Sequence, residues 1–329
     1  MTTLGQVASR AGCSLATASR VLNGTGPVSD EMVRKVRRAA AELGYRTAGP
    51  SASSKRRPVV GVLIPSITNP VFAASVSSIQ SRMLVAGHGV LIAQSAYDPA
   101  RERDAIASLL NQQPTGLILT LCDARRATTL PDDLPPTVLL SNAPTARFPA
   151  AVNADNRLAG RDITEYLLSR GHRRILFVSG HFGASDRAML RYEGYCDAMT
   201  AAGMTALDAT QVAFVDGFET LDLSAALSRF LPSAIIASND LLALGVIDAL
   251  RRQGLAVPDD VSVAGFDGIA IGRLTDPILT TVEMPDLTMG AAAASLLLDM
   301  AEKAAPPRHL QVAHRLRQGG TVRATADER

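Results

Sequence analysis

From Val59 to the C-terminus, short apolar runs alternate with longer amphipathic segments, and this alternation limits the possible folds more than any other feature. Apolar runs of four to eight residues predict buried strands, and segments with a helical period predict helices. Regular alternation of the two favours parallel sheets covered by helices on both faces. The stretch exceeds one typical sheet, so we expect an α/β body of two doubly wound parallel-sheet subdomains. The expected strands are 59–64, 90–95, 116–121, 137–141, 174–179, 211–215, 233–237 and 261–265, and the expected helices are 70–86, 99–112, 155–170, 188–202, 219–231 and 241–253.

The N-terminal segment has a different pattern, that of three short helices. The first carries apolar residues at i, i+3, i+4 and i+7 from Leu4 and ends at Gly12. Ser14 is suited to cap the second helix, 15–22, and the third begins at Ser29. The joint between the first two helices is as short as a helix-turn-helix requires. The segment is therefore predicted to be an all-α helix-turn-helix head.

The second helix of this head has two unlike faces. On a helical wheel Ala18 and Val21 fall on an apolar side, and the opposite side is small and polar with the single basic residue Arg20. Such a face suits the major groove, where an Arg can donate to O6 and N7 of guanine. The hydroxyls of Thr17 and Ser19 are candidates for phosphate contacts. An amphipathic helix with a solvated polar face is the alternative interpretation.

Charge is distributed unevenly along the chain. The totals nearly cancel, with 33 Lys and Arg against 31 Asp and Glu. Residues 1–58, however, hold ten basic and three acidic residues, net +7, whereas residues 59–329 hold 23 and 28, net −5. A basic head on an acidic body predicts a polyanionic partner for the head and repulsion between that partner and the body.

Several classes of protein are disfavoured. No apolar run approaches the roughly 18 residues of a membrane helix, and the N-terminus lacks the profile of a secretory signal. The three scattered cysteines fit a reducing compartment. The sequence contains no CxxC motif or Cys/His cluster that would suggest a metal site. The enzyme motifs GxxxxGK[ST], HExxH and GxSxG are also absent. We therefore expect a cytoplasmic protein that is not an enzyme and needs no metal or cofactor.

The head contains the run LGQVASRAGCSLATASRVLNG at residues 4–24, which closely resembles the DNA-binding head of the lactose/galactose repressor family. The body continues the likeness with VGVLIP at 60–65, ASND at 237–240, VPDDVSVAGFD at 257–267 and LTTV at 279–282. The motifs occur in order and at suitable spacing, so the resemblance covers nearly the whole chain. It implies a DNA-binding regulator whose body is similar to periplasmic sugar-binding proteins.

The resemblance also implies roles for residues of the head. The positions that match base-reading residues are Leu15, Ala16 and Arg20. Because Leu15 and Ala16 are apolar, we expect them to discriminate by packing against thymine methyl groups. The residues expected to contact the DNA backbone are Thr17, Ser19, Asn23, Ser29, Lys55, Arg56 and Arg57.

The linker at 47–58 departs from the family pattern. In the family this segment folds on DNA into a hinge helix whose Leu enters the minor groove. Here the matching position is Ala52 or Ser54, depending on the end from which it is counted, and neither is an apolar wedge. We expect weaker kinking of the operator, with the basic run 55–57 adding phosphate attraction. An ordinary solvated basic linker is the alternative.

A ligand is expected in the cleft between the two subdomains, because ligands of such folds bind at the carboxyl ends of strands. By resemblance, Arg191 and Asp267 form the centre of the site. A carboxylate accepts from adjacent sugar hydroxyls and a guanidinium donates to sugar oxygens; a structural salt bridge is the alternative. The complete expected effector set is Ser66, Asn69, Phe72, Ser141, Arg187, Arg191, Phe218, Asn239 and Asp267.

Two of these positions differ from the family pattern. Ser141 stands where many relatives carry Asp, and Arg187 stands where a small hydroxyl residue is common. The loss of a carboxylate and the gain of a guanidinium make a phosphorylated or acidic sugar conceivable as the ligand. An Arg187 that points out of the cleft is the alternative.

Together these features predict a repressor that binds a pseudo-palindromic operator as a homodimer under the control of a sugar-like effector. A transport-type sugar-binding protein and a sugar-metabolising enzyme are the alternatives. The tail, 315–329, lacks a heptad pattern, so no tetramerisation coiled coil is expected. The predicted domains are the head, 1–46; the linker, 47–58; and the body, 59–329, with subdomains 59–152 plus 286–305 and 153–285 plus 306–329.

Overall fold

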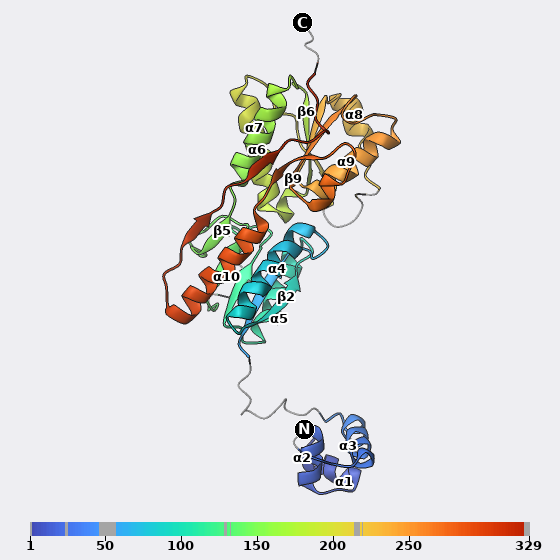
Figure 1. Cartoon of the computed structure of the whole chain (residues 1–329), viewed down its shortest axis with the longest axis vertical. Coiled ribbons are helices and arrows are strands. Elements are labelled where there is room, and N and C mark those ends of the chain that lie inside the picture. Colours follow the sequence, from blue (N-terminus) through green and yellow to red (C-terminus); the bar gives the residue numbers. More distant parts are fainter. Residues whose placement is uncertain are drawn as a thin grey trace. The chain divides into compact units, whose positions relative to one another are not determined.

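The structure of the chain is a computed structural model that describes residues 2–23, 26–45, 57–127, 130–131, 133–213, 218 and 220–325. It divides into two compact units, Met1–Arg57 and Pro58–Arg329, called here the head and the body. Each is described by itself (Figure 1). The predicted linker residues Lys55 and Arg56 lie outside the described residues, whereas Arg57 is described and exposed.

The head consists of three helices, α1 (Leu4–Ala11), α2 (Leu15–Asn23) and α3 (Asp30–Glu42). Gly12 ends α1 with φ +66°, a left-handed conformation that glycine adopts without steric cost. The Ser14 hydroxyl accepts from the backbone N–H of Thr17 at 3.1 Å and so caps α2, as the sequence predicts. The helices enclose a small apolar core made of Val7, Ala8, Ala11, Ala18, Val21, Val36, Ala39 and Ala40.

The first subdomain of the body is built on a six-stranded parallel sheet in the order β11-β5-β4-β3-β1-β2. One face packs against α4 (Pro70–Val85) and α10 (Asp286–Lys303), and the other packs against α5 (Pro99–Leu110). The strands are β1 (Val59–Ile64), β2 (Gly89–Gln94), β3 (Gly116–Leu119), β4 (Thr137–Leu140), β5 (Ala151–Asn153) and β11 (His309–Gln311).

The second subdomain repeats this plan with the strand order β12-β10-β9-β8-β6-β7, in which only β12 is antiparallel to its neighbour. Helices α6 (Asn156–Ser169) and α7 (Asp186–Ala201) cover one face, and α8 (Ser224–Phe230) and α9 (Asp240–Arg252) cover the other. The strands are β6 (Ile175–Gly180), β7 (Thr210–Val212), β8 (Ala234–Ala237), β9 (Ser262–Asp267), β10 (Thr280–Glu283) and β12 (Arg315–Arg317).

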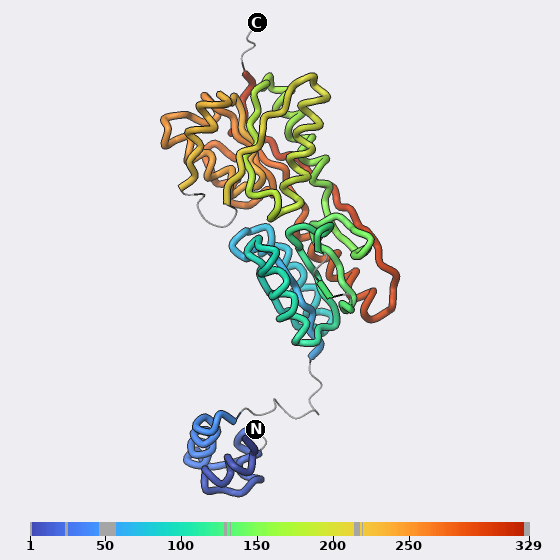
Figure 2. Tube along the Cα trace, turned by 180° about the vertical axis from the view of Figure 1, so that it is seen from behind, coloured from blue at the N-terminus to red at the C-terminus, as the bar shows by residue number. Residues whose placement is uncertain are grey.

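The chain passes between the two sheets three times, after β5, after β10 and after β11 (Figures 1 and 2). The third passage corrects a predicted boundary. Residues 306–329 were assigned to the second subdomain, but β11 pairs with β5 in the first sheet, with His309 opposite Ala151. The error has a physical reason: β11 is three residues long and largely exposed, so its hydropathy does not reveal a strand.

The predicted fold class is confirmed, since the body holds two mostly parallel sheets with helices on both faces. Each of the eight predicted strands overlaps an observed one, although residues 214 and 215 of the predicted strand 211–215 lie outside the described residues. The predicted helix 219–231 is shorter, at Ser224–Phe230. The elements that the sequence pattern did not predict are β5, β10, α10, β11 and β12.

Candidate functional site

One candidate site is the exposed face of α2 in the head. Ala18 and Val21 are buried, as predicted for the apolar side, whereas Leu15, Ala16 and Arg20 are exposed. Leu15 is 56% exposed. The predicted base-reading residues therefore form one accessible surface on a helix held by the core.

The neighbouring polar side chains of the head support this surface. Asn23 Nδ2 donates to Ser19 Oγ at 3.1 Å, and Thr17 Oγ1 lies 2.8 Å from Ser14 Oγ. Ser29 is exposed at the start of α3, and its side chain makes no capping hydrogen bond. These hydroxyl and amide groups border the exposed face of α2 or follow it along the chain, and they carry no net charge.

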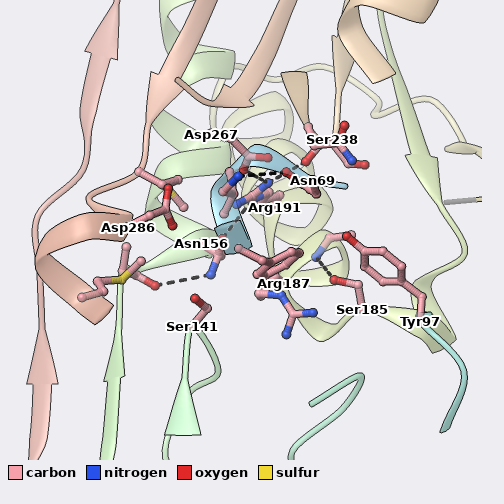
Figure 3. A pocket seen from close by; sticks show the side chains of 17 residues that line it. Asn69, Tyr97, Ser141, Asn156, Ser185, Arg187, Arg191, Ser238, Asp267 and Asp286 are labelled. Atoms are coloured by element: carbon pink, nitrogen blue, oxygen red, sulfur yellow. Dashed lines mark hydrogen bonds and ion pairs between the residues drawn. The ribbon is translucent and has the colours of Figure 1, made fainter. Parts of the chain in front are cut away.

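The second candidate site is a pocket between the two subdomains of the body, enclosing about 520 Å³ including its open side (Figure 3). It receives residues from the carboxyl ends of strands in both sheets and from the starts of α4, α6, α7 and α10. The lining residues are Asn69, Val71, Phe72, Tyr97, Ser141, Ala154, Asn156, Ser185, Arg187, Ala188, Arg191, Ser238, Asn239, Asp267, Met284, Asp286 and Met289.

Seven of the nine predicted effector residues line this pocket; Ser66 and Phe218 do not. The Ser66 hydroxyl is engaged with Thr68 Oγ1 at 2.7 Å within its own turn. Phe218 packs against the apolar cluster of α8 and α9, and its backbone lies close to Gly245. Neither residue is part of the surface of the pocket.

Sequence reasoning missed several polar residues of the pocket. Asn156 and Asp286 begin α6 and α10, directly after two of the passages between sheets, and Tyr97 follows β2. Ser185 precedes α7 and Ser238 follows β8. Ser185 lies in the segment that follows the carboxyl end of β6, so the rule that ligands bind at strand ends was a usable signal for it. Ser238 belongs to the ASND motif at 237–240.

Arg191 and Asp267 occupy the centre of the polar network. Arg191 Nη1 donates to Asp267 Oδ1 at 3.2 Å and to the Ser238 carbonyl at 2.6 Å, and its Nε donates to Asn156 Oδ1 at 2.9 Å. The guanidinium also lies over the ring of Phe266, with 4.7 Å to its centroid. Arg191 thus ties α6, α7, β8 and β9 together at the cleft.

Burial changes the acidity of the groups in the pocket. It raises the pKa of Asp267 to about 6, against the lowering effect of Arg191, and it raises the pKa of Tyr97 to about 12. Burial, reinforced by the nearby Asp267 charge, raises the pKa of Asp286 well above its usual range. Burial therefore favours the protonated form of Asp286, in which the carboxyl group can donate a hydrogen bond as well as accept one.

Backbone strain is concentrated at the pocket. Tyr97, Ser141 and Asp267 have φ values of +58°, +67° and +107°, a region that residues other than glycine rarely occupy. Each follows or ends a parallel strand. Such conformations cost about 1–3 kcal/mol each and are concentrated at functional sites. All three residues line the pocket.

Arg187 does not point to solvent. It is 6% exposed, and its Nη1 donates to the carbonyl of Leu121 in the first subdomain at 2.7 Å and to Asp186 Oδ1 at 3.1 Å. Asp186 also accepts from Asn142 Nδ2 at 2.9 Å. Burial raises the pKa of Asp186, with Arg187 opposing the shift. Residues at the start of α7 therefore cross the cleft and hold the opposite subdomain.

Asn239 has a structural role as well as its place in the pocket. Its Oδ1 accepts from the backbone N–H of Leu242 at 2.8 Å and caps α9. Its side-chain nitrogen is the group left to act in the cleft.

The described residues contain no group of three His, Cys, Asp or Glu side chains arranged to hold a metal ion. None of the helices in the described part of the chain is long and apolar enough to span a membrane.

Comparisons with known proteins match the head and the body to two families of domains. Residues 3–48 match the family model for bacterial regulatory proteins of the lacI family, and residues 164–322 match that for a periplasmic binding protein-like domain. The HTH-type transcriptional regulator GntR of Escherichia coli K12 is 31% identical over 331 residues, which cover 97% of this chain and 98% of the relative.

Solved structures show the same relationship. The lac repressor dimer bound to operator and the anti-inducer ONPF has a TM-score of 0.70 at 25% identity, covering 98% of this chain and 99% of that one. The transcriptional regulator CelR in complex with cellobiose has a TM-score of 0.69 at 27% identity, covering 98% and 100%. These relatives are regulators and not enzymes. A DNA-binding head, a two-subdomain body and near-complete alignment with such proteins together show that the chain belongs to the LacI family of bacterial transcription regulators.

Proposed function

We propose that this protein is a cytoplasmic repressor that binds a pseudo-palindromic operator as a homodimer and is controlled by a small polyhydroxylated effector in the cleft. In each head, Leu15, Ala16 and Arg20 read bases in the major groove. Thr17, Ser19, Asn23 and Ser29 contact the backbone, and the basic linker residues Lys55, Arg56 and Arg57 add attraction to phosphates.

The observation that carries this proposal is the pairing of Arg191 with Asp267 in a pocket built from both subdomains of the body. A guanidinium and a carboxylate side by side offer donors and acceptors to the adjacent hydroxyls of a sugar. A ligand that contacts both subdomains binds their closed arrangement more tightly and so shifts the population toward it. Complexes of relatives with an anti-inducer and with cellobiose support control by a small molecule.

The closed arrangement is coupled to DNA binding through the linker. Because coupling free energies are reciprocal, the effector and the operator must change each other's affinity by the same factor. Two heads held by a dimer of bodies would contact half-sites one helical turn apart, about 10 base pairs.

Gel-shift titration of the full chain against the DNA upstream of its own gene tests the proposal. We expect a specific shift with one palindromic fragment that weakens steeply with salt. The complex should contain two chains per operator, measured by sedimentation. A wild-type chain that gives no specific shift with or without candidate effectors would overturn the assignment, and turnover of a sugar would revive the enzyme alternative.

A further inference from the structure

Arg187 has an unusual hydrogen-bond arrangement for a buried arginine. Its Nη1 is shared between Leu121 O and Asp186 Oδ1, but its Nη2 has no hydrogen-bond partner among the described residues and no contact with solvent. An unpaired N–H on a buried charge is costly, so native structures rarely leave one without a purpose. Because Arg187 lines the pocket, a small rotation of its guanidinium toward the cleft would let a bound molecule supply the missing acceptor for Nη2.

Two hydroxyls lie on the same side of the pocket. In Figure 3, Ser141, Arg187 and Ser185 line its lower side, and Asp267 and Asp286 lie above them. Ser185 Oγ accepts from the Ala188 backbone N–H at 3.3 Å, so its proton is free to be donated into the cleft. The hydroxyl of Ser141 makes no hydrogen bond to another described residue. One side of the pocket is thus formed by donors.

The acceptors are concentrated at the opposite side. Asp267 retains an oxygen that is not used by Arg191, and Asp286 presents its carboxyl to the cleft. Arg191 faces this side but is already hydrogen-bonded through Nε and Nη1. A ligand that matches the pocket therefore has hydroxyl groups at one end and a strong acceptor at the other.

On this basis we propose that the effector is a sugar derivative bearing an anionic group, carboxylate or phosphate, and that Arg187 Nη2 with the hydroxyls of Ser141 and Ser185 receives that group. The inference rests on the proposed function of the cleft. It gives Arg187 two simultaneous tasks, because Nη1 keeps its contact with Leu121 of the first subdomain while Nη2 holds the ligand. The anion thereby reinforces the closed arrangement.

Isothermal titration calorimetry of the full chain with matched ligand pairs tests this assignment. The pairs are D-gluconate with D-glucitol, D-galactonate with galactitol, and D-glucose 6-phosphate with D-glucose. In the first two pairs a carboxylate replaces a terminal CH2OH group, and in the third a phosphate is added to one. We expect at least one anion to bind about 10- to 100-fold more tightly than its neutral partner, as a hydrogen bond to a buried charged group allows. Tighter binding of the aldonates would identify the anionic group of the effector as a carboxylate, and tighter binding of the phosphate ester would identify it as a phosphate.

Variants separate recognition from stability of the cleft. Arg187→Gln should lower the affinity for the anion much more than the affinity for its neutral partner, and so remove the preference. Ser141→Asp should selectively lower the affinity for the anion, because it places a second negative charge beside the ligand. Asp tolerates the positive φ of this position. Asp186→Asn perturbs the same junction without removing the guanidinium and should keep the preference. Arg103→Gln is the matched control, since this exposed arginine lies on α5 and does not line the pocket.

Each contrary result has a definite meaning. A neutral sugar that binds the wild-type chain as tightly as its anionic partner would overturn the assignment of the anion, as would a panel in which no anion binds. An equal loss of anion preference in Asp186→Asn would show that Arg187 acts only by holding the junction, which also overturns it. None of these results touches operator binding by the wild-type chain, so failure of the proposed function is recognised separately.

Discussion

Arg191 Nη1 lies 3.2 Å from Asp267 Oδ1, and the two residues reach each other from the first half of α7 and from the last position of β9. Both side chains are more than nine-tenths buried. The desolvation of such a pair is offset only when further hydrogen bonds complete it, and Asn156 and the Ser238 carbonyl do so here. The centre of the cleft is therefore both a structural joint and a preformed binding surface.

Arg191→Met should lower the free energy of unfolding by about 3–5 kcal/mol, since it leaves the Asp267 carboxylate buried without its partner. Urea denaturation at pH 7.5 measures the change. The double variant Arg191→Met/Asp267→Asn removes the stranded charge, and Asn tolerates a positive φ, so it should recover part of the loss. Strictly additive costs would mean that the two residues are not coupled.

Gly160→Ala tests the close crossing of α6 and α7 that positions Arg187 and Arg191. A Cβ at Gly160 would lie 2.1 Å from the Arg191 carbonyl oxygen, and one at Gly194 would lie 2.0 Å from that of Arg157. Backbone atoms cannot move aside as a flexible side chain can, so overpacking of about 1–3 kcal/mol is expected. The change in operator affinity that the effector causes should also become smaller.

Thermal denaturation measures this effect, and Gly183→Ala provides its control, because a Cβ there meets nothing within 4 Å. A Gly160→Ala protein as stable as wild type would show that the helices separate without cost. The chain has no Trp, so a dye or circular dichroism must report unfolding.

The sequence predicted the body well where hydropathy and burial agree. Strand 59–64 was predicted at its observed bounds because five of its six residues are buried. Helix α10 was missed because its run AAAASLLL is apolar on nearly every side, which matches no single helical face. Strands β11 and β12 were missed because they are three residues long and mostly polar, and pairing alone defines them.

The candidate site was predictable to the extent that it follows strand ends. Arg191 and Asp267 lie where the resemblance places them, and they meet. Tyr97 lines the pocket with a positive φ, and it could not be predicted because no local pattern encodes that conformation. Asp286 depends on where the chain returns to the first sheet. The orientation of Arg187 was left open by the sequence, and packing against Leu121 decides it.

The stability of the body should fall as pH rises between about 5 and 7. Burial raises the pKa of Asp240 to about 7 and that of Asp267 to about 6, from 3.8. In this interval the folded state binds more protons than the unfolded state, so unfolding becomes easier as pH increases. Each group contributes a slope of up to about 1.4 kcal/mol per pH unit.

Urea denaturation at pH 5, 6 and 7.5 measures this slope. Asp240→Asn should make this slope smaller. Asp222→Asn should leave the slope unchanged, because Asp222 is exposed and its hydrogen bonds to Ser224 lower its pKa. Acids of that second kind stabilise the fold as pH rises, but their effect is complete below pH 5. A wild-type slope that Asp240→Asn leaves unchanged would assign the dependence to other groups.

Arg20→Ala should reduce the affinity for the operator by about 1–3 kcal/mol, the discrimination that one bidentate base contact supplies. Binding to unrelated DNA should change much less, because Arg20 is proposed to read a base. Asn23→Ala, which removes a neutral backbone contact, should instead weaken both complexes to a similar degree and leave the salt slope unchanged. Fluorescence anisotropy at several salt concentrations measures the affinity of each variant for unrelated DNA and for an operator selected from a palindromic pool.

Arg103→Ala is the matched control for charge, because this exposed arginine lies on α5 of the acidic body. It should bind both DNAs as the wild type does, since the body is expected to repel DNA. If Arg20→Ala lowered both affinities equally and reduced the salt slope by about one unit, Arg20 would be a phosphate contact. Base recognition by α2 would then depend on the apolar pair Leu15 and Ala16, and the operator would have to place thymine methyl groups against them.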